Sequence, residues 1–280
     1  MPIEVPTSSD RNLVVIKVGT SSLATTEATS GIPCLDKAAF QRIGAQVIEL
    51  HKDNDVVIVT SGAIAAGMGK TRMSERPKPE TQMEELQRLA SVGNINLLNA
   101  WQSALGLIVV GGLLLTRLDL ERRDNKSSSA INTICTHLSH RDVPVINEND
   151  AIATEEIKFG DNDTLSAIVA AQLKHAYPER DVKLVLLSDV DGLYERPGDS
   201  SSRIKIVTNL GEVACFAGGA GTENGTGGMV TKIAAAEIAM QAGVRMWIAN
   251  GQKEAGIIRA LAGSTGTHFI PFAAQDTRVL

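Results

Sequence analysis

Lys17 is the residue near the N-terminus whose type and neighbours best suit phosphate chemistry. It closes a short β-branched run and is followed by Val-Gly-Thr-Ser-Ser. Gly19 would permit close backbone approach, and hydroxyl groups from Thr20 onward could donate hydrogen bonds to phosphate oxygens. Taken alone, the segment is better explained as an exposed lysine at a strand end followed by a turn. A phosphate site would need a partner elsewhere in the chain.

Lys232 offers such a partner, because it follows a glycine-rich segment. Residues Gly225–Lys232 read GTGGMVTK and lead into an Ala-rich stretch predicted to be helical. Free N–H groups and the dipole at a helix N-terminus attract anions. Lys232 lies about one turn after Gly228, and helical side chains lean toward the N-terminus, so its ammonium can return to the same phosphates. A flexible glycine loop before a packed helix is the alternative interpretation.

A third lysine segment, Ile64–Thr71, resembles a P-loop only at its end. Ile64 stands where that motif requires its first glycine, and the residues that follow are a poor helix start. We therefore expect Gly69–Thr71 to be a loop, and Thr60–Ala63, which directly follows a strand, to be the more interesting segment. No G-x-G-x-x-G sequence follows the first strand, so hydride transfer loses its main support.

Two acidic clusters lie close together in the sequence. Asn147–Asp150 comes directly after the apolar run VPVI, and Asp161–Asp163 comes just before the helical stretch TLSAIVAAQL. Helix capping explains at least one residue of the second cluster, but it cannot need all three. Carboxylates beside nucleotide phosphates can orient lysines or hold the metal ion that accompanies ATP, and amides can recognise polar groups of a substrate. Both clusters suit such work.

Ser188 and Asp189 follow another apolar run, LVLL, and Asp191-Gly192 completes a turn that could contact a nucleotide. A plain turn explains the segment equally well. The D-x-D-G fragment lacks the spacing of a calcium-binding loop, and the five histidines form no ligand-spaced pair. We therefore assign no metal-ligating residue and no catalytic histidine.

The elements that must position these residues alternate between β-branched runs and helical stretches, a pattern typical of a parallel sheet covered by helices. The predicted strands are Leu13–Val18, Val56–Thr60, Leu107–Leu115, Val143–Ile146, Leu184–Leu187 and Val244–Ala249. The predicted helices are Asp36–His51, Thr81–Ala104, Lys126–His140, Asn162–His175, Gly228–Ala242 and Lys253–Ala262. Ligands of open parallel sheets bind beyond the carboxyl ends of the strands, which is where the residues above fall.

Composition narrows the function class. The chain has 280 residues, a formal charge of −5 and no sustained basic stripe, so nucleic acid is not an expected partner. No apolar run is long enough to span a bilayer, and three cysteines without a CxxC pair fit a reducing compartment, so we expect a cytoplasmic location. The polar segments Ala24–Pro33, Met73–Pro79 and Arg196–Arg203 are spaced as surface loops within one domain.

Taken together, six segments resemble the glutamate 5-kinases, a family of the amino-acid kinase superfamily. They occur in that family's order and cover most of the chain. The six segments together are more specific than any one segment, and they separate this family from acetylglutamate, aspartate and nucleoside-monophosphate kinases. The segments are Ile16–Ser22, Thr60–Ala63, Val145–Asp150, Gly160–Asp163, Leu187–Tyr194 and Gly225–Lys232.

The resemblance implies a three-layer α/β/α sandwich and an ATP-dependent kinase that converts L-glutamate to L-glutamyl 5-phosphate, the first step toward proline. It implies ATP and Mg²⁺ as cofactors. The implied catalytic residues are Lys17, Lys232, Asp161 and Asp163. The implied glutamate-binding residues are Ser61, Gly62, Asn147, Asp150 and Asn162. The implied nucleotide-binding residues are Lys17, Gly19, Thr20, Ser188, Asp189, Thr226, Gly227, Gly228, Met229, Val230, Thr231 and Lys232.

Other expectations from the resemblance concern regulation and assembly. Proline would be a feedback inhibitor, and the chain would form a dimer or tetramer. Ala24–Pro33 looks like an extra stretch, and we expect residues 1–280 to form a single kinase domain without the C-terminal PUA domain of many bacterial members. The alternative functions are another small-carboxylate or carbamate kinase of the same fold, and a non-catalytic amino-acid sensor.

Overall fold

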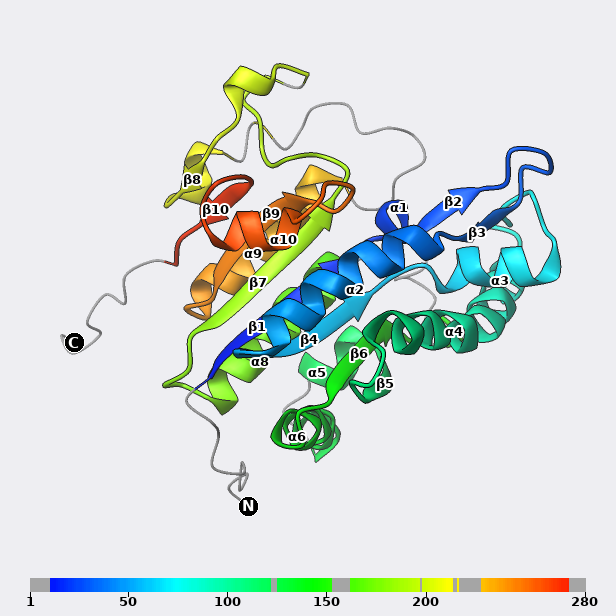
Figure 1. Ribbon diagram of the computed structural model, residues 1–280, viewed down its shortest axis with the longest axis horizontal. Coiled ribbons are helices and arrows are strands. Elements are labelled where there is room, and N and C mark those ends of the chain that lie inside the picture. The colour runs from blue at the N-terminus through cyan, green and yellow to red at the C-terminus, as the bar shows by residue number, and fades with distance from the viewer. Residues whose placement is uncertain are drawn as a thin grey trace.

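The computed structural model describes residues 11–121, 125–152, 162–196, 198–213, 216 and 228–271. Within these residues a central sheet holds eight strands in the order β5-β6-β4-β1-β7-β9-β10-β8 (Figure 1). Neighbouring strands pair in parallel, except that β9 and β10 are antiparallel. The strands are β1 (Asn12–Val18), β4 (Asn54–Thr60), β5 (Val110–Leu115), β6 (Val143–Glu148), β7 (Val182–Ser188), β8 (Ile206–Val207), β9 (Arg245–Asn250) and β10 (Thr267–Phe269).

Helices cover both faces of this sheet, because its inner strands are apolar on both sides. Val15 packs in the core under α5, α6, α8 and α9, whereas Val14 and Ile16 pack in the opposite core with α2, α3, α4 and α10. The predicted α/β/α sandwich is confirmed. The helices are α1 (Thr20–Leu23), α2 (Lys37–His51), α3 (Ala63–Thr71), α4 (Met83–Leu105), α5 (Arg117–Glu121), α6 (Asn125–Ser139), α8 (Asn162–Ala176), α9 (Met229–Gln241) and α10 (Gly256–Leu261).

The strand register gathers the polar strand ends at one edge of the sheet. Val18 of β1 is level with Thr60 of β4 on one side and with Leu187 of β7 on the other. Ser188 of β7 is in turn level with Asn250 of β9. Parallel strands that are in register end together, so the segments after β4, β1, β7 and β9 all emerge on the carboxyl side of the sheet.

The prediction of a loop at Gly69–Thr71 is wrong, because these residues form the last turn of α3. Gly69 instead permits close packing of α3 on β3 (Pro33–Leu35), because a Cβ atom there would lie 2.6 Å from the carbonyl oxygen of Pro33, and other glycines bring α3 close to α4. A Cβ atom on Gly67 would lie 2.0 Å from the carbonyl oxygen of Leu89 in α4, and one on Gly93 would lie 1.8 Å from that of Ala63 in α3. Glycine in these helices therefore marks a close contact between backbones. Helix propensity alone cannot distinguish such a glycine from one in a turn.

Two other boundaries differ from expectation. The segment Ala24–Pro33 is not a plain surface loop, because its ends contribute to an antiparallel hairpin of β2 (Ala24–Thr26) and β3 (Pro33–Leu35). β5 begins at Val110 and not at Leu107, since α4 runs to Leu105 and the chain turns at Gly106 with φ 64°. Among the described residues, no helix combines the length and apolar character needed to cross a membrane.

The contact between α3 and α4 makes a stability prediction. Gly93→Ala should lower the free energy of unfolding by about 3 kcal/mol, because a methyl group would meet the Ala63 carbonyl and push the two helices apart. Urea unfolding followed by circular dichroism measures the change. Ser91→Ala, at an exposed position of the same helix, is the matched control and should change stability by no more than about 0.5 kcal/mol. An unchanged urea midpoint for Gly93→Ala would contradict this packing.

Candidate functional site

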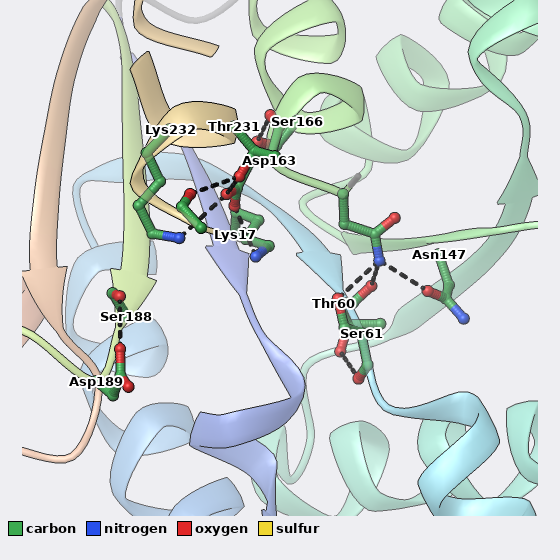
Figure 2. Close-up of polar contacts among 12 residues, drawn as sticks. Lys17, Thr60, Ser61, Asn147, Asp163, Ser166, Ser188, Asp189, Thr231 and Lys232 are labelled. Atoms are coloured by element: carbon green, nitrogen blue, oxygen red, sulfur yellow. Dashed lines mark hydrogen bonds and ion pairs between the residues drawn. The ribbon is translucent and has the colours of Figure 1, made fainter. Parts of the chain in front are cut away.

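Two predicted lysines meet at one carboxylate on the carboxyl side of the sheet. The Nζ atom of Lys17 lies 2.6 Å from Oδ1 of Asp163, and Nζ of Lys232 lies 3.2 Å from Oδ2 (Figure 2). The three residues come from β1, α8 and α9, and each is 6% exposed or less. We call this group the lysine centre. It brings together residues that are far apart in sequence, as the predicted phosphate site requires.

Gly19 shapes the lysine centre by leaving room for Lys17. A Cβ atom at position 19 would lie 3.3 Å from Lys17 Nζ, closer than most side-chain contacts. The glycine is buried and precedes the first turn of α1, with an extended φ of −77° that any residue can adopt. Its role here is therefore one of space and not of conformational freedom.

Asp163 is held in its ionised form. Burial by itself raises the pKa of this carboxyl, but the charges of Lys17 and Lys232, with a hydrogen bond from Thr231, lower the pKa to about 2. Thr231 Oγ1 lies 2.8 Å from Asp163 Oδ2 and also 2.8 Å from the carbonyl oxygen of Gly228. The carboxylate therefore stays negative at neutral pH and fixes two ammonium groups beside each other. Paired cations of this kind can stabilise a transferring phosphoryl group.

A second group of polar side chains, which we call the amide cluster, consists of Asn94, Asn147, Asn162 and Ser61. Asn162 Nδ2 donates its two hydrogens to the carbonyl oxygen of Thr60 at 2.8 Å and to Ser61 Oγ at 2.7 Å, and makes a longer, shared contact of 3.3 Å with Asn147 Oδ1 (Figure 2). Asn147 Nδ2 donates in turn to Asn94 Oδ1 at 2.9 Å. Gly62, with φ 108°, lets the chain turn from β4 into α3 directly after Ser61.

The first two residues of α8 contact other elements at the sheet edge through their side chains. Asn162 makes hydrogen bonds to the end of β4, to the residue after it and to β6. Asp163 accepts a hydrogen bond from Thr231 and forms an ion pair with Lys17. Asp161, the remaining residue of this acidic cluster, lies outside the described residues. Adjacent side chains of α8 thus reach different groups, Asn162 the amide cluster and Asp163 the lysine centre.

The third predicted part of the site is the turn after β7, which we call the Ser188 turn. Ser188 Oγ donates to Asp189 Oδ1 at 3.0 Å, and Asn250 Nδ2 at the end of β9 donates to the backbone oxygen of Asp189 at 3.2 Å. Beyond it, Lys253 pairs with Asp191 at 2.6 Å. These contacts hold the turn against β9, at the sheet edge next to the lysine centre.

Strand order decides how the three groups are arranged. Because β1 lies between β4 and β7, the lysine centre has the amide cluster of β4 and β6 on one side and the Ser188 turn on the other (Figure 2). Two ligands that approached from these two sides would meet at the lysines. The geometry therefore suits transfer of an anionic group between two molecules held at the sheet edge.

Some predicted residues contribute less clearly. Thr20 is exposed at the start of α1, and Val230 is 62% exposed on α9. Asp150 is half-buried just beyond β6, where its charge acts on Arg76 of the 73–79 segment. Asp161, Thr226 and Gly227 lie outside the described residues.

Sequence reasoning missed two residues of α4 that contact the site. Asn94 belongs to the amide cluster, and Trp101 Nε1 donates to Thr60 Oγ1 at 3.0 Å. They are seven positions apart, so they lie on the same face of the helix. A buried asparagine in register with the apolar residues Leu86, Leu97 and Trp101 was the signal that could have revealed them.

Comparison with known proteins gives one family and a consistent set of relatives. The Amino acid kinase family matches residues 12–250. A glutamate 5-kinase of Clostridium acetobutylicum is 42% identical over 271 residues, which is 94% of this chain and 96% of that protein. A glutamate 5-kinase of Haemophilus influenzae is 39% identical over 279 residues, 96% of this chain and 71% of that protein.

Solved structures agree at the level of the fold. An isopentenyl phosphate kinase structure superposes with a TM-score of 0.57 at 18% identity, covering 92% of this chain and 100% of that one. At this identity the likeness shows a shared architecture, to which the lysine centre and the amide cluster add the chemistry.

Proposed function

The chain belongs to the amino acid kinase family, and from its near-full-length identity of about 40% to glutamate 5-kinases we infer that it is an ATP-dependent kinase of that activity. It transfers the γ-phosphoryl group of ATP to the side-chain carboxylate of L-glutamate, which gives L-glutamyl 5-phosphate and ADP in proline biosynthesis. The observation that carries the mechanism is the lysine centre, where Lys17 and Lys232 share Asp163 between two polar groups of the sheet edge.

The reaction needs charge stabilisation more than proton transfer. A glutamate side chain has a reference pKa of about 4.3, so its carboxylate is already a nucleophile at neutral pH and requires no general base. Its approach to the anionic γ-phosphate is opposed by repulsion. Lys17 and Lys232 would offset that repulsion at the transferring group, and Asp163 would position both ammonium groups before ATP arrives.

We assign the two sides of the lysine centre to the two substrates. The amide cluster, with Gly62 and Asp150, would bind glutamate, because carbonyl, amide and hydroxyl groups match the ammonium and carboxylate of an amino acid. The Ser188 turn, Gly19, Thr20 and the N-terminal turn of α9 would bind ATP, because free N–H groups there attract phosphates. The roles proposed for Asp161, Thr226 and Gly227 rest on the resemblance.

Mg²⁺ is proposed as a companion of ATP and not as a resident of the protein. Among the described residues, no three carboxylate, thiolate or imidazole side chains are grouped to hold a metal ion. Asp163, the most buried site carboxylate among the described residues, already faces two lysines. Mg²⁺ usually keeps several waters and binds through substrate phosphates with one or two carboxylates, which fits this arrangement. It would supply further charge neutralisation at the phosphates.

An acyl-phosphate trap tests the proposed reaction. The purified chain, incubated with ATP, Mg²⁺ and L-glutamate, should form a product that hydroxylamine converts to the glutamyl hydroxamate. L-Aspartate and N-acetyl-L-glutamate should give little product, which separates this function from another carboxylate kinase of the same fold. Binding of glutamate with no ADP release would favour a non-catalytic sensor. Equal turnover of the three acceptors would contradict glutamate as the substrate.

We extend the proposal to regulation and context on the resemblance alone. Proline would inhibit, the chain would assemble as a dimer or tetramer, and residues 1–280 would act as one domain in the cytoplasm. Rates that do not respond to millimolar proline would contradict feedback inhibition, and a monomeric mass by light scattering would contradict the dimer or tetramer. Two separate unfolding transitions would contradict a single domain. Recovery from a membrane or secreted fraction would contradict the cytoplasmic location.

A further inference from the structure

The amide cluster has a direction that one backbone group determines. The carbonyl oxygen of Thr60 can only accept a hydrogen bond, so the atom of Asn162 that faces it at 2.8 Å must be the nitrogen Nδ2. The atom of Asn147 that faces the same nitrogen must then be its oxygen. Asn147 Nδ2 is thereby directed at Asn94, whose oxygen accepts it. The hydrogen-bond network thereby assigns the orientation of all three amides.

Two amide atoms are left over when these hydrogen bonds are made. Asn162 Oδ1 and Asn94 Nδ2 are both buried and have no hydrogen-bond partner among the described residues. Both residues are 6% exposed. Burying a polar atom without a hydrogen-bond partner costs free energy, so each of these two atoms needs an explanation.

The unpartnered oxygen of Asn162 has the chemistry of a ligand group. An amide oxygen that only accepts would bind a cation-like donor such as an amino acid's ammonium. Next to it, Ser61 Oγ accepts from Asn162, so its own hydrogen remains available to a ligand oxygen. The pair presents one acceptor and one donor, which complements the ammonium and carboxylate carried on the α-carbon of an amino acid.

We propose that Asn94 of α4 is a positioning residue for the acceptor substrate, acting by holding the Asn147 amide in place beside Asn162. This inference rests on the proposed function and adds a residue to its substrate side. Asn94 reaches the cluster with one hydrogen bond, at the cost of burying its own unpaired Nδ2. An apolar side chain of similar size would avoid that cost, so packing alone does not explain an asparagine there.

The substitutions Asn94→Leu and Asn94→Asp separate positioning from packing. Leucine fills similar space but offers no acceptor to Asn147, whose side chain can then rotate out of its place beside Asn162. Aspartate has the shape of asparagine and still accepts from Asn147 Nδ2. Leu105→Ala, a buried position at the far end of the same helix, is the matched control for a general loss of stability.

The experiment measures L-glutamate binding by calorimetry and KM for both substrates in the hydroxamate assay. Asn94→Leu should weaken glutamate binding and raise its KM by about tenfold, with KM for ATP within about twofold of wild type. Asn94→Asp should stay within about threefold of wild type, and Leu105→Ala should lower the unfolding midpoint without changing either KM. In an Asn147→Ala background, Asn94→Leu should add less than about twofold, because both act on one hydrogen-bonded chain.

The outcomes distinguish this inference from the proposed function. An active wild type whose glutamate KM is unchanged in Asn94→Leu, or whose two KM values rise together, overturns the positioning role alone. Full additivity with Asn147→Ala also overturns it. A wild type that binds glutamate without turnover, with binding weakened in Asn94→Leu, overturns the proposed function and supports the positioning role. No glutamate binding by wild type overturns both.

Discussion

Lys17→Met and Lys232→Met should each reduce kcat for glutamyl phosphate formation by about a thousandfold or more. Methionine keeps most of the buried side-chain volume but removes the ammonium group that lies beside Asp163. With one ammonium group missing, the repulsion between the glutamate side-chain carboxylate and the γ-phosphate of ATP would be offset less. Steady-state kinetics with hydroxylamine trapping measures the loss.

Lys183→Met is the matched control for these two variants. Lys183 is also a lysine of a central strand, but it pairs with Asp181 at the opposite, amino-terminal edge of the sheet, 3.2 Å away. The kcat of the Lys183→Met variant should stay within about twofold of wild type. Near-normal turnover in Lys17→Met or Lys232→Met would remove that lysine from the proposed mechanism. An equal loss in all three variants would indicate damage to the sheet and not to the site.

Asp163→Asn should cost both activity and stability. The amide has the same shape but no charge, so two buried ammonium groups lose the carboxylate that lies between them. We expect kcat to fall by about a hundredfold or more, because the lysines would no longer be held in place. The pKa of Asp163, about 2, lies below the ordinary aspartate value of about 3.9, which corresponds to a stabilisation of about 2 kcal/mol that the variant would lose.

The pH dependence of this stability difference has a defined sign. Because the folded-state pKa lies below the unfolded value, the contribution of Asp163 is present above about pH 4 and is lost as the pH falls toward 2. Urea midpoints of wild type and Asp163→Asn should therefore differ by a constant amount from about pH 5 to 8 and converge in acid. Asp181→Asn, which removes a partly exposed carboxylate at the other sheet edge, should show a much smaller difference. A gap that widens in acid would contradict the ion-pair assignment.

Local patterns predicted the elements and the polar ends of the strands. β-branched runs such as Leu13–Val18 became buried parallel strands, and Asp36 caps α2 through hydrogen bonds to Ala38 and Ala39. These signals involve only a few neighbouring residues, so they can be recognised from the sequence alone. They failed at Gly69–Thr71, where a loop was expected and the chain is helical, because Gly69 serves tertiary packing against Pro33 of β3.

What the sequence by itself determined is therefore the fold class, the sheet edge and the residue types available there, together with the resemblance that named the family. Only the tertiary structure decided which groups face each other. It placed Asp163 against the two lysines and the neighbouring Asn162 in the amide cluster, and it brought Asn94 into contact with Asn147. Strand order and helix packing set these contacts between distant residues, and the direction of the amides depends on one backbone carbonyl. Neither is encoded in the spacing of residues along the chain.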